Sequence, residues 1–94
     1  MQLKGNINGS TQVQIGLGTL IKARRKQLYP NDTQEIFAAR IGVGETTMSK
    51  IENGKSGVAW NTVFDCLILL NMERNLKALL SDELQTTLKA NTSW

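Results

Sequence analysis

The side chains that most often carry chemistry in proteins are scarce in this sequence. Histidine is absent from the 94 residues, and Cys66 is the single cysteine. A Cys/His zinc site, a catalytic triad with a histidine base and an intrachain disulfide are therefore excluded within one chain. Cys66 lies in the apolar stretch 63–70, where burial raises the pKa of a thiol. We expect a buried structural thiol, no metal, no cofactor and no enzymatic activity.

The remaining chemistry is that of cations and of hydrogen-bonding side chains. The net charge is +3, and it is unevenly distributed along the chain. Residues 1–55 carry eight Lys/Arg against four Asp/Glu, whereas residues 56–94 carry three against four. A basic N-terminal half is typical of proteins that bind a polyanion.

Helical spacing and helix-end signals predict the elements that position these side chains. The expected helices span about 17–28, 33–41, 45–52, 60–70 and 72–80. Pro30 ends the first, and Gly42, Gly54 and Asn71 end the next three. We divide the chain into a flexible arm (1–16), one helical domain (17–72) and a C-terminal helix or tail (73–94).

Two of the expected helices carry informative apolar patterns. One face of the first is formed by Leu17, Leu20, Ile21, Arg24 and Leu28. The fourth, 60–70, is apolar almost all round and should be central. Together with Leu76, Leu79 and Leu80, it gives more apolar surface than a monomer of this size hides, so we expect a homodimer.

Two short helices joined by a glycine-containing turn form the signature of a helix-turn-helix. Here the segments 33–41 and 45–52 flank the turn Gly42-Val43-Gly44. In that motif the second helix enters the major groove of DNA, and its N-terminal residues contact base edges. The sequence therefore predicts a DNA-binding protein.

The same stretch carries a resemblance to a known family. Residues 33–55, TQEIFAARIGVGETTMSKIENGK, match without a gap the pattern T-Q-E-x-x-A-x-x-x-G-V-x-x-x-T-[hydrophobic]-S-x-[hydrophobic]-E-x-G-K. Residues 18–25 match G-x-x-I-[KR]-x-x-R. On these residues the chain resembles the Xre family of lambda-repressor/Cro type over 18–71. The resemblance implies an all-α, five-helix fold and a transcriptional repressor that binds an inverted repeat as a dimer.

The resemblance also implies roles for individual residues. Base contacts are implied for Gly44, Glu45, Thr46, Ser49 and Lys50, where Glu45 suits cytosine N4 and Lys50 suits guanine. Phosphate contacts are implied for Lys22, Arg25, Gln34, Thr47, Asn53 and Lys55. Gln34 would also brace the recognition helix. A structural ion pair is implied between Arg25 and Glu52, on the first and third helices.

Some residues depart from the family pattern. Glu45 stands where Gln or Ser is common, which favours a protein-binding module as one alternative. The link 29–32 is about two residues longer than usual, and Ala59 replaces a helix-capping Ser or Asp. Residues 71–80 resemble, more loosely, the end of antitoxins that pair with Hip-type kinase toxins. A second alternative is therefore an antitoxin that autoregulates its operon and neutralises a toxin partner through residues 72–94.

The cellular setting follows from simple absences. No apolar run approaches the roughly 20 residues of a membrane helix. The first ten residues lack the order of a signal peptide. We expect a cytoplasmic protein of a bacterium or phage, whose partners are double-stranded DNA and a second copy of the chain.

Overall fold

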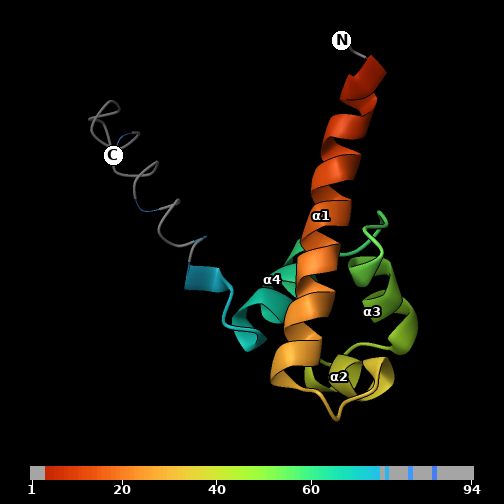
Figure 1. Ribbon diagram of the computed structural model, residues 1–94, viewed down its shortest axis with the longest axis vertical. Coiled ribbons are helices and arrows are strands. Elements are labelled where there is room, and N and C mark those ends of the chain that lie inside the picture. Colours follow the sequence, from red (N-terminus) through yellow and green to blue (C-terminus); the bar gives the residue numbers. More distant parts are fainter. Residues whose placement is uncertain (1–3, 75, 77–80, 82–85, 87–94) are drawn as a thin grey trace.

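The computed structural model describes residues 4–74, 76, 81 and 86 (Figure 1). Within this part of the chain the secondary structure is helical and contains no strand. The helices are α1 (Lys4–Leu28), α2 (Gln34–Arg40), α3 (Glu45–Glu52) and α4 (Trp60–Leu69). The all-α class is thus confirmed for the described residues. The helix expected at 72–80 lies mostly outside them.

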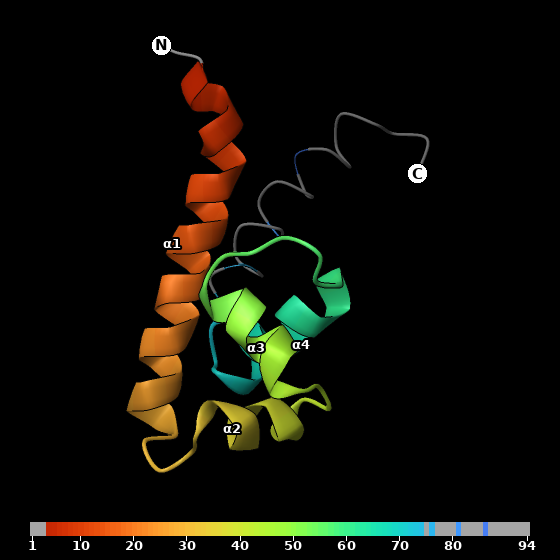
Figure 2. The ribbon, with the colours of Figure 1, turned by 90° about the vertical axis from the view of Figure 1, so that its right-hand side faces the viewer.

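The first helix is longer than the sequence pattern indicates. α1 begins at Lys4, whereas the expected helix begins at Leu17, so the expected arm is helical from Lys4 on. Gly5, Gly9 and Gly16 lower the helix propensity of this stretch, which hides it from pattern analysis. In two perpendicular views, the N-terminal half of α1 projects beyond the other helices (Figures 1 and 2).

The buried face of α1 also differs from the expected one. Leu20 is 60% and Leu28 40% exposed, whereas Gly18, Ile21 and Arg25 are buried. The reason is a close backbone approach, because a Cβ added to Gly18 would lie 2.7 Å from the carbonyl oxygen of Glu52. Only glycine permits this distance, so the side of α1 that carries Gly18 packs against α3.

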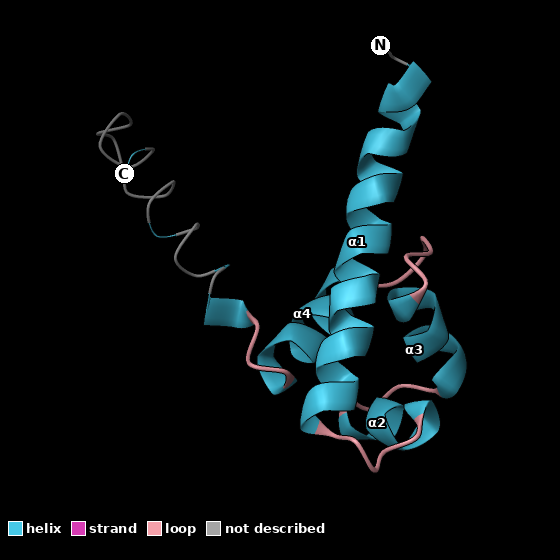
Figure 3. Ribbon diagram, viewed as in Figure 1, coloured by secondary structure: helices cyan, strands magenta, loops and turns pink. Residues whose placement is uncertain are grey.

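Three helices end in the same way. The residue after each C-cap has a positive φ: Gly42 (76°), Gly54 (68°) and Asn71 (57°). After α2, the Val43 N–H donates to the carbonyl of Ala38 at 3.0 Å, and the Gly42 N–H donates to that of Ala39 at 3.1 Å. This pair of bonds is the Schellman motif, and it recurs after α3 and α4. The three helix stops expected from the sequence are confirmed, and the loops between them are short (Figure 3).

The core draws on all four helices. It contains Ile21, Phe37, Ala38, Met48, Ile51, Cys66, Leu67 and Leu70. Cys66 is fully buried, and this burial raises the pKa of its thiol to about 11. The expected structural thiol is confirmed, because a group with that pKa stays protonated at neutral pH.

The helix α4, which the sequence predicts to be central, contributes one face to the core. Cys66, Leu67 and Leu70 face the core, but Trp60 is 78% and Ile68 57% exposed. A ten-residue helix at the edge of a four-helix core has one buried face only, whatever its composition. Its opposite face is therefore apolar and open to solvent.

Candidate nucleic-acid interface

The geometry of α2 and α3 is fixed by local hydrogen bonds at both ends of α2. Thr33 caps α2, since its Oγ1 accepts from the Ile36 N–H at 3.1 Å. At the other end, the Schellman motif leads directly to Gly44, the N-cap residue of α3. As a glycine, Gly44 forms no side-chain capping hydrogen bond. The short link holds the two helices in direct contact.

The helix α3 has a polar face and a buried face, each set by the spacing of its residues. Met48, Ile51 and Glu52 lie on the buried face. At about 100° per residue, the other side of the helix carries the positions 46, 49, 50 and 53, and position 45 lies at its edge in the first turn. Glu45, Thr46, Lys50 and Asn53 are exposed there, and Ser49 is half-buried. The face therefore presents a carboxylate, hydroxyls, an amide and a cation side by side.

These side chains line a shallow groove of about 550 Å³. Its lining consists of Gln34, Glu45, Thr46, Ser49, Lys50, Asn53 and Lys55. Each of the seven residues belongs to the set that the sequence assigned to base or phosphate contacts. Inside the groove, the Asn53 Nδ2 donates to the Ser49 Oγ at 3.2 Å. In the described part of the chain, neither Lys50 nor Lys55 forms an ion pair, so both cations remain available to a ligand.

A buried ion pair lies directly beneath the groove. Arg25 Nε donates to Glu52 Oε2 at 2.6 Å, and Arg25 Nη2 donates to Glu52 Oε1 at 3.0 Å. The two side chains are only 7% and 1% exposed. The hydrogen bond from Arg25 to Glu52 raises the pKa of the guanidinium, with the attraction of the carboxylate adding to it. Gln34 joins the pair, since its Nε2 donates to Glu52 Oε1 at 3.0 Å.

This network links three helices and separates the two roles implied for Arg25. The structure places Arg25 in the ion pair with Glu52, which connects α1 to α3. The guanidinium of Arg25 is buried against that carboxylate and is not exposed for contact with a phosphate. The phosphate contact implied for Arg25 is therefore corrected to a structural role. Gln34 reaches from the start of α2 both to Glu52 and into the groove, so one amide connects the buried pair to the surface.

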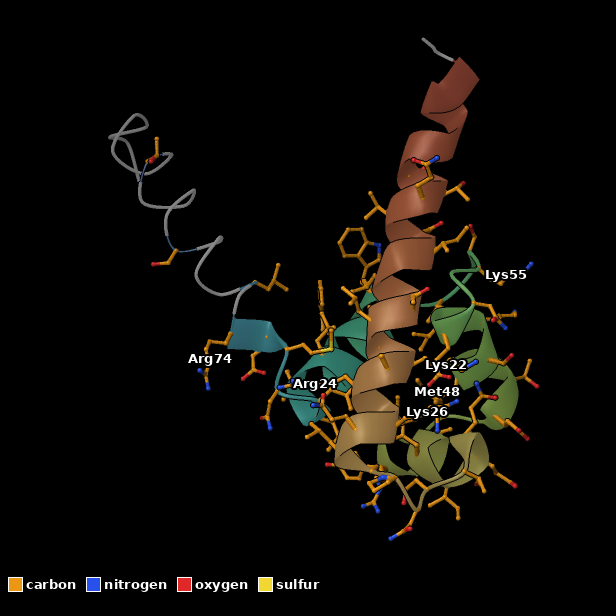
Figure 4. The ribbon with its side chains drawn as sticks, viewed as in Figure 1. Lys22, Arg24, Lys26, Met48, Lys55 and Arg74 are labelled. Atoms are coloured by element: carbon orange, nitrogen blue, oxygen red, sulfur yellow. The ribbon has the colours of Figure 1, made fainter. Side chains whose placement is uncertain are left out.

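The other residues singled out in the sequence lie around the groove. Lys22 is exposed on the side of α1 that faces α3, with Lys26 one turn further on the same side (Figure 4). Lys55 lies in the loop after α3, also on this side. Thr47 is half-buried at the margin of α3 and does not line the groove. Three separate cations thus surround the polar face of α3.

Two supporting contacts were not found from the sequence. Arg24 Nε donates to the carbonyl of Leu70 at 3.0 Å, which connects α1 to the end of α4. Arg40 pairs with Asp32, with Nε–Oδ2 at 2.5 Å, and its guanidinium lies 4.7 Å from the Tyr29 ring centroid. The spacing of Asp32 and Arg40 around α2 is the only sequence signal for this pair.

Other kinds of site have no counterpart in the described residues. These residues contain no group of three or more His, Cys, Asp or Glu side chains placed to hold a metal ion. None of the helices in this part of the chain has both the length and the hydropathy to cross a membrane.

Comparison with known proteins gives one curated relative. The chain is 35% identical over 60 residues to the "ImmF control region 10 kDa protein" of Bacillus phage phi105. The match covers 64% of this chain and 64% of the relative, so the chain spans less than two thirds of that protein's length. No protein-family profile matches the sequence, and no solved structure matches it. The relative's name is compatible with a regulatory role in a small phage protein.

Proposed function

We propose that this chain is a sequence-specific DNA-binding regulator of the phage-repressor kind, in which α2 and α3 form a helix-turn-helix. The observation that carries the proposal is the α3 groove. Its seven lining residues are ones that the sequence assigned to DNA, although they come from α2, α3 and the loop after α3. Such a coincidence between a sequence pattern and one concave surface supports a binding site built for a ligand.

The chemistry of the groove suits duplex DNA. Lys50, Thr46, Ser49 and Glu45 offer donors and acceptors that can read base edges from the major groove. Lys55 and Asn53 at the end of α3, with Lys22 on α1, suit the flanking phosphates. An α-helix with its side chains is about 10–12 Å in diameter, so a helix such as α3 fits the major groove, which is about 12 Å wide. In this proposal Glu45 sets the base preference by accepting a hydrogen bond from cytosine N4.

The proposal extends to a dimer that represses transcription from an inverted repeat, with half-sites one helical turn apart. The control-region relative supports a regulatory setting. We assign no catalytic role to the chain. The antitoxin alternative depends on residues 72–94, most of which lie outside the described residues, and it stays a prediction.

A salt titration tests the proposal without knowledge of the operator. Binding to a random-sequence duplex is measured for the wild type and for the double variant Lys50→Ala/Lys55→Ala. We expect micromolar affinity that falls steeply with salt, and a log–log slope smaller by about one to two in the variant. The charge-matched control is Arg74→Glu, which also lowers the net charge by two, because Arg74 lies far from α3 (Figure 4).

Two outcomes would reject the proposal. One is absence of binding by the wild type at about 50 mM salt, where non-specific binding is strong. The other is an equal loss of affinity in the groove variant and in the control, which would show attraction by net charge alone.

A further inference from the structure

The loop that follows α3 lies against α1 through a contact between two backbones. We call residues 53–58 the Lys55 loop. Gly54 has a positive φ of 68°, and a Cβ added to it would lie 2.5 Å from the Cα of Ile15 and 2.7 Å from its backbone nitrogen. Backbone atoms of a helix cannot move aside as the end of a flexible side chain can, so only glycine permits this approach. The loop therefore begins directly beside the turn of α1 that contains Ile15 (Figure 2).

This contact restricts the position of the next residue, Lys55. The Lys55 N–H donates to the carbonyl of Lys50 at 2.8 Å, and the Gly54 N–H donates to that of Ile51 at 3.1 Å. The start of the loop is thus attached to α3 by hydrogen bonds and confined by α1 on another side. The Lys55 side chain is exposed and lines the α3 groove. The point from which it reaches into the groove is therefore set by both helices.

The part of α1 beside the loop carries no charge. Asp and Glu are absent from the first 31 residues of the chain, and α1 has no charged residue between Lys4 and Lys22. A carboxylate on this part of α1 would attract the Lys55 ammonium group and compete with a phosphate. Without one, α1 confines the backbone of the loop and leaves its cation available.

We propose that the turn of α1 around Ile15 is a positioning element for DNA binding, which acts through Gly54 to hold Lys55 where a backbone phosphate can reach it. The inference rests on the proposed function and gives a role in it to residues 4–16, which the sequence pattern assigned to a flexible arm. Phosphate contacts fix the register of a protein on the duplex, and a donor in a fixed position serves this better than a mobile one. If the contact at Gly54 is lost, Lys55 keeps its charge but loses its fixed position.

A double-mutant cycle on the full chain tests this inference. Affinity for a random-sequence duplex at low salt is measured for the wild type, Lys55→Ala, Gly54→Ala and the double variant. We expect Lys55→Ala to weaken binding about fivefold in the wild type and less than about twofold in the Gly54→Ala background, because a displaced cation contributes less. The matched control is Gly42→Ala, since Gly42 also has a positive φ after a helix but an added Cβ has nothing within 4 Å. In that background Lys55→Ala should keep its full effect.

A second pair of variants serves if Gly54→Ala does not fold. Ile15→Pro attaches a ring to the backbone nitrogen that lies beside Gly54, whereas Gly9→Pro adds the same ring at a position of α1 where a Cβ has nothing within 4 Å. A helix can begin at either proline, so the residues from Gly18 onward keep their contacts with α3. We expect Ile15→Pro to reduce the effect of Lys55→Ala as Gly54→Ala does, and Gly9→Pro to leave it unchanged.

The possible outcomes separate this inference from the proposed function. A loss of affinity on Lys55→Ala that is equally large in every background would overturn the inference and leave DNA binding by the α3 groove intact. A Lys55→Ala variant that binds as tightly as the wild type would overturn it as well. Absence of DNA binding by the wild type would reject the inference and the proposed function together.

Discussion

At the scale of single residues, the Arg25–Glu52 pair connects the stability of the fold to the placement of the groove. Both side chains are almost fully buried, and Gln34 adds a third partner from the groove itself. Replacing one member of a buried pair leaves an uncompensated charge. We expect Glu52→Gln to lower the free energy of unfolding by about 3–5 kcal/mol, measured by urea denaturation.

An apolar replacement of both members is the control for that experiment. Arg25→Met/Glu52→Leu removes both charges and should cost clearly less than Glu52→Gln, because no buried charge is left behind. If Glu52→Gln costs less than about 1 kcal/mol, the pair does not hold α1 against α3.

Lys50 and Lys55 have different positions and should have different effects on DNA binding. Lys50 lies on the polar face of α3, whereas Lys55 follows the helix in the loop. Once an operator is selected, Lys50→Ala should cost about 1–3 kcal/mol at one base position and relax the preference there. Lys55→Ala should weaken binding to all sequences alike. Competition with single-base variants of the operator measures both effects, and identical profiles for the two variants would contradict this assignment.

The Asp32–Arg40 pair predicts a dependence of stability on pH. The hydrogen bond from Arg40 lowers the pKa of Asp32 in the folded protein, with attraction by Arg40 and Arg25 adding to it. Because the folded pKa lies below the unfolded value, the contribution is present above about pH 4 and is lost as the pH falls through the folded pKa. In denaturation curves from pH 7 to 2, Asp32→Asn should therefore differ most from the wild type at neutral pH and converge with it in acid. Parallel curves would show that the pair is not linked to folding.

At the scale of the helices, the glycines of α1 divide into two kinds. A Cβ at Gly18 would meet the backbone of α3, at 2.7 Å from the Glu52 oxygen, whereas Gly16 has nothing within 4 Å. The close approach at Gly18 is what brings the end of α3 against α1.

This difference predicts opposite effects of the same substitution. Gly16→Ala should stabilise the protein by up to about 1 kcal/mol, because alanine is the better helix former. Gly18→Ala should destabilise it by roughly 1–3 kcal/mol, since two backbones must move apart. Urea denaturation compares the two variants directly. Changes of the same sign would mean that α1 and α3 are not in close contact at Gly18.

The helix ends could be predicted from the sequence, because their signals are local. Gly42, Gly54 and Asn71 each tolerate a positive φ, and each ends a helix as expected. The orientation of α1 and α4 could not be predicted in the same way. Which face of α1 is buried depends on a backbone contact at Gly18 with a distant helix, and the exposure of Trp60 and Ile68 depends on what packs against α4.

At the scale of the whole molecule, two concave surfaces of different chemistry share no lining residue. The α3 groove is polar and carries Lys50 and Lys55, and the α4 face is apolar and uncharged where it is hollowed. The residues of the polar groove could be predicted because they follow the 33–55 pattern. The apolar hollow beside α4 could not be predicted, because its lining combines Leu17 and Met72, which lie at opposite ends of the domain in the sequence. A molecule bound in one of the two grooves therefore leaves the lining of the other open.

The most direct test of the central proposal is to map the DNA-binding face in solution. Amide chemical shifts of the ¹⁵N-labelled full chain are followed while a duplex is added at low salt. The proposal predicts that the largest changes fall on Gln34, residues 45–50, Asn53 and Lys55, with residues 60–70 of α4 almost unchanged. Largest changes along α4, or none at α3, would contradict the claim that the α3 groove binds DNA.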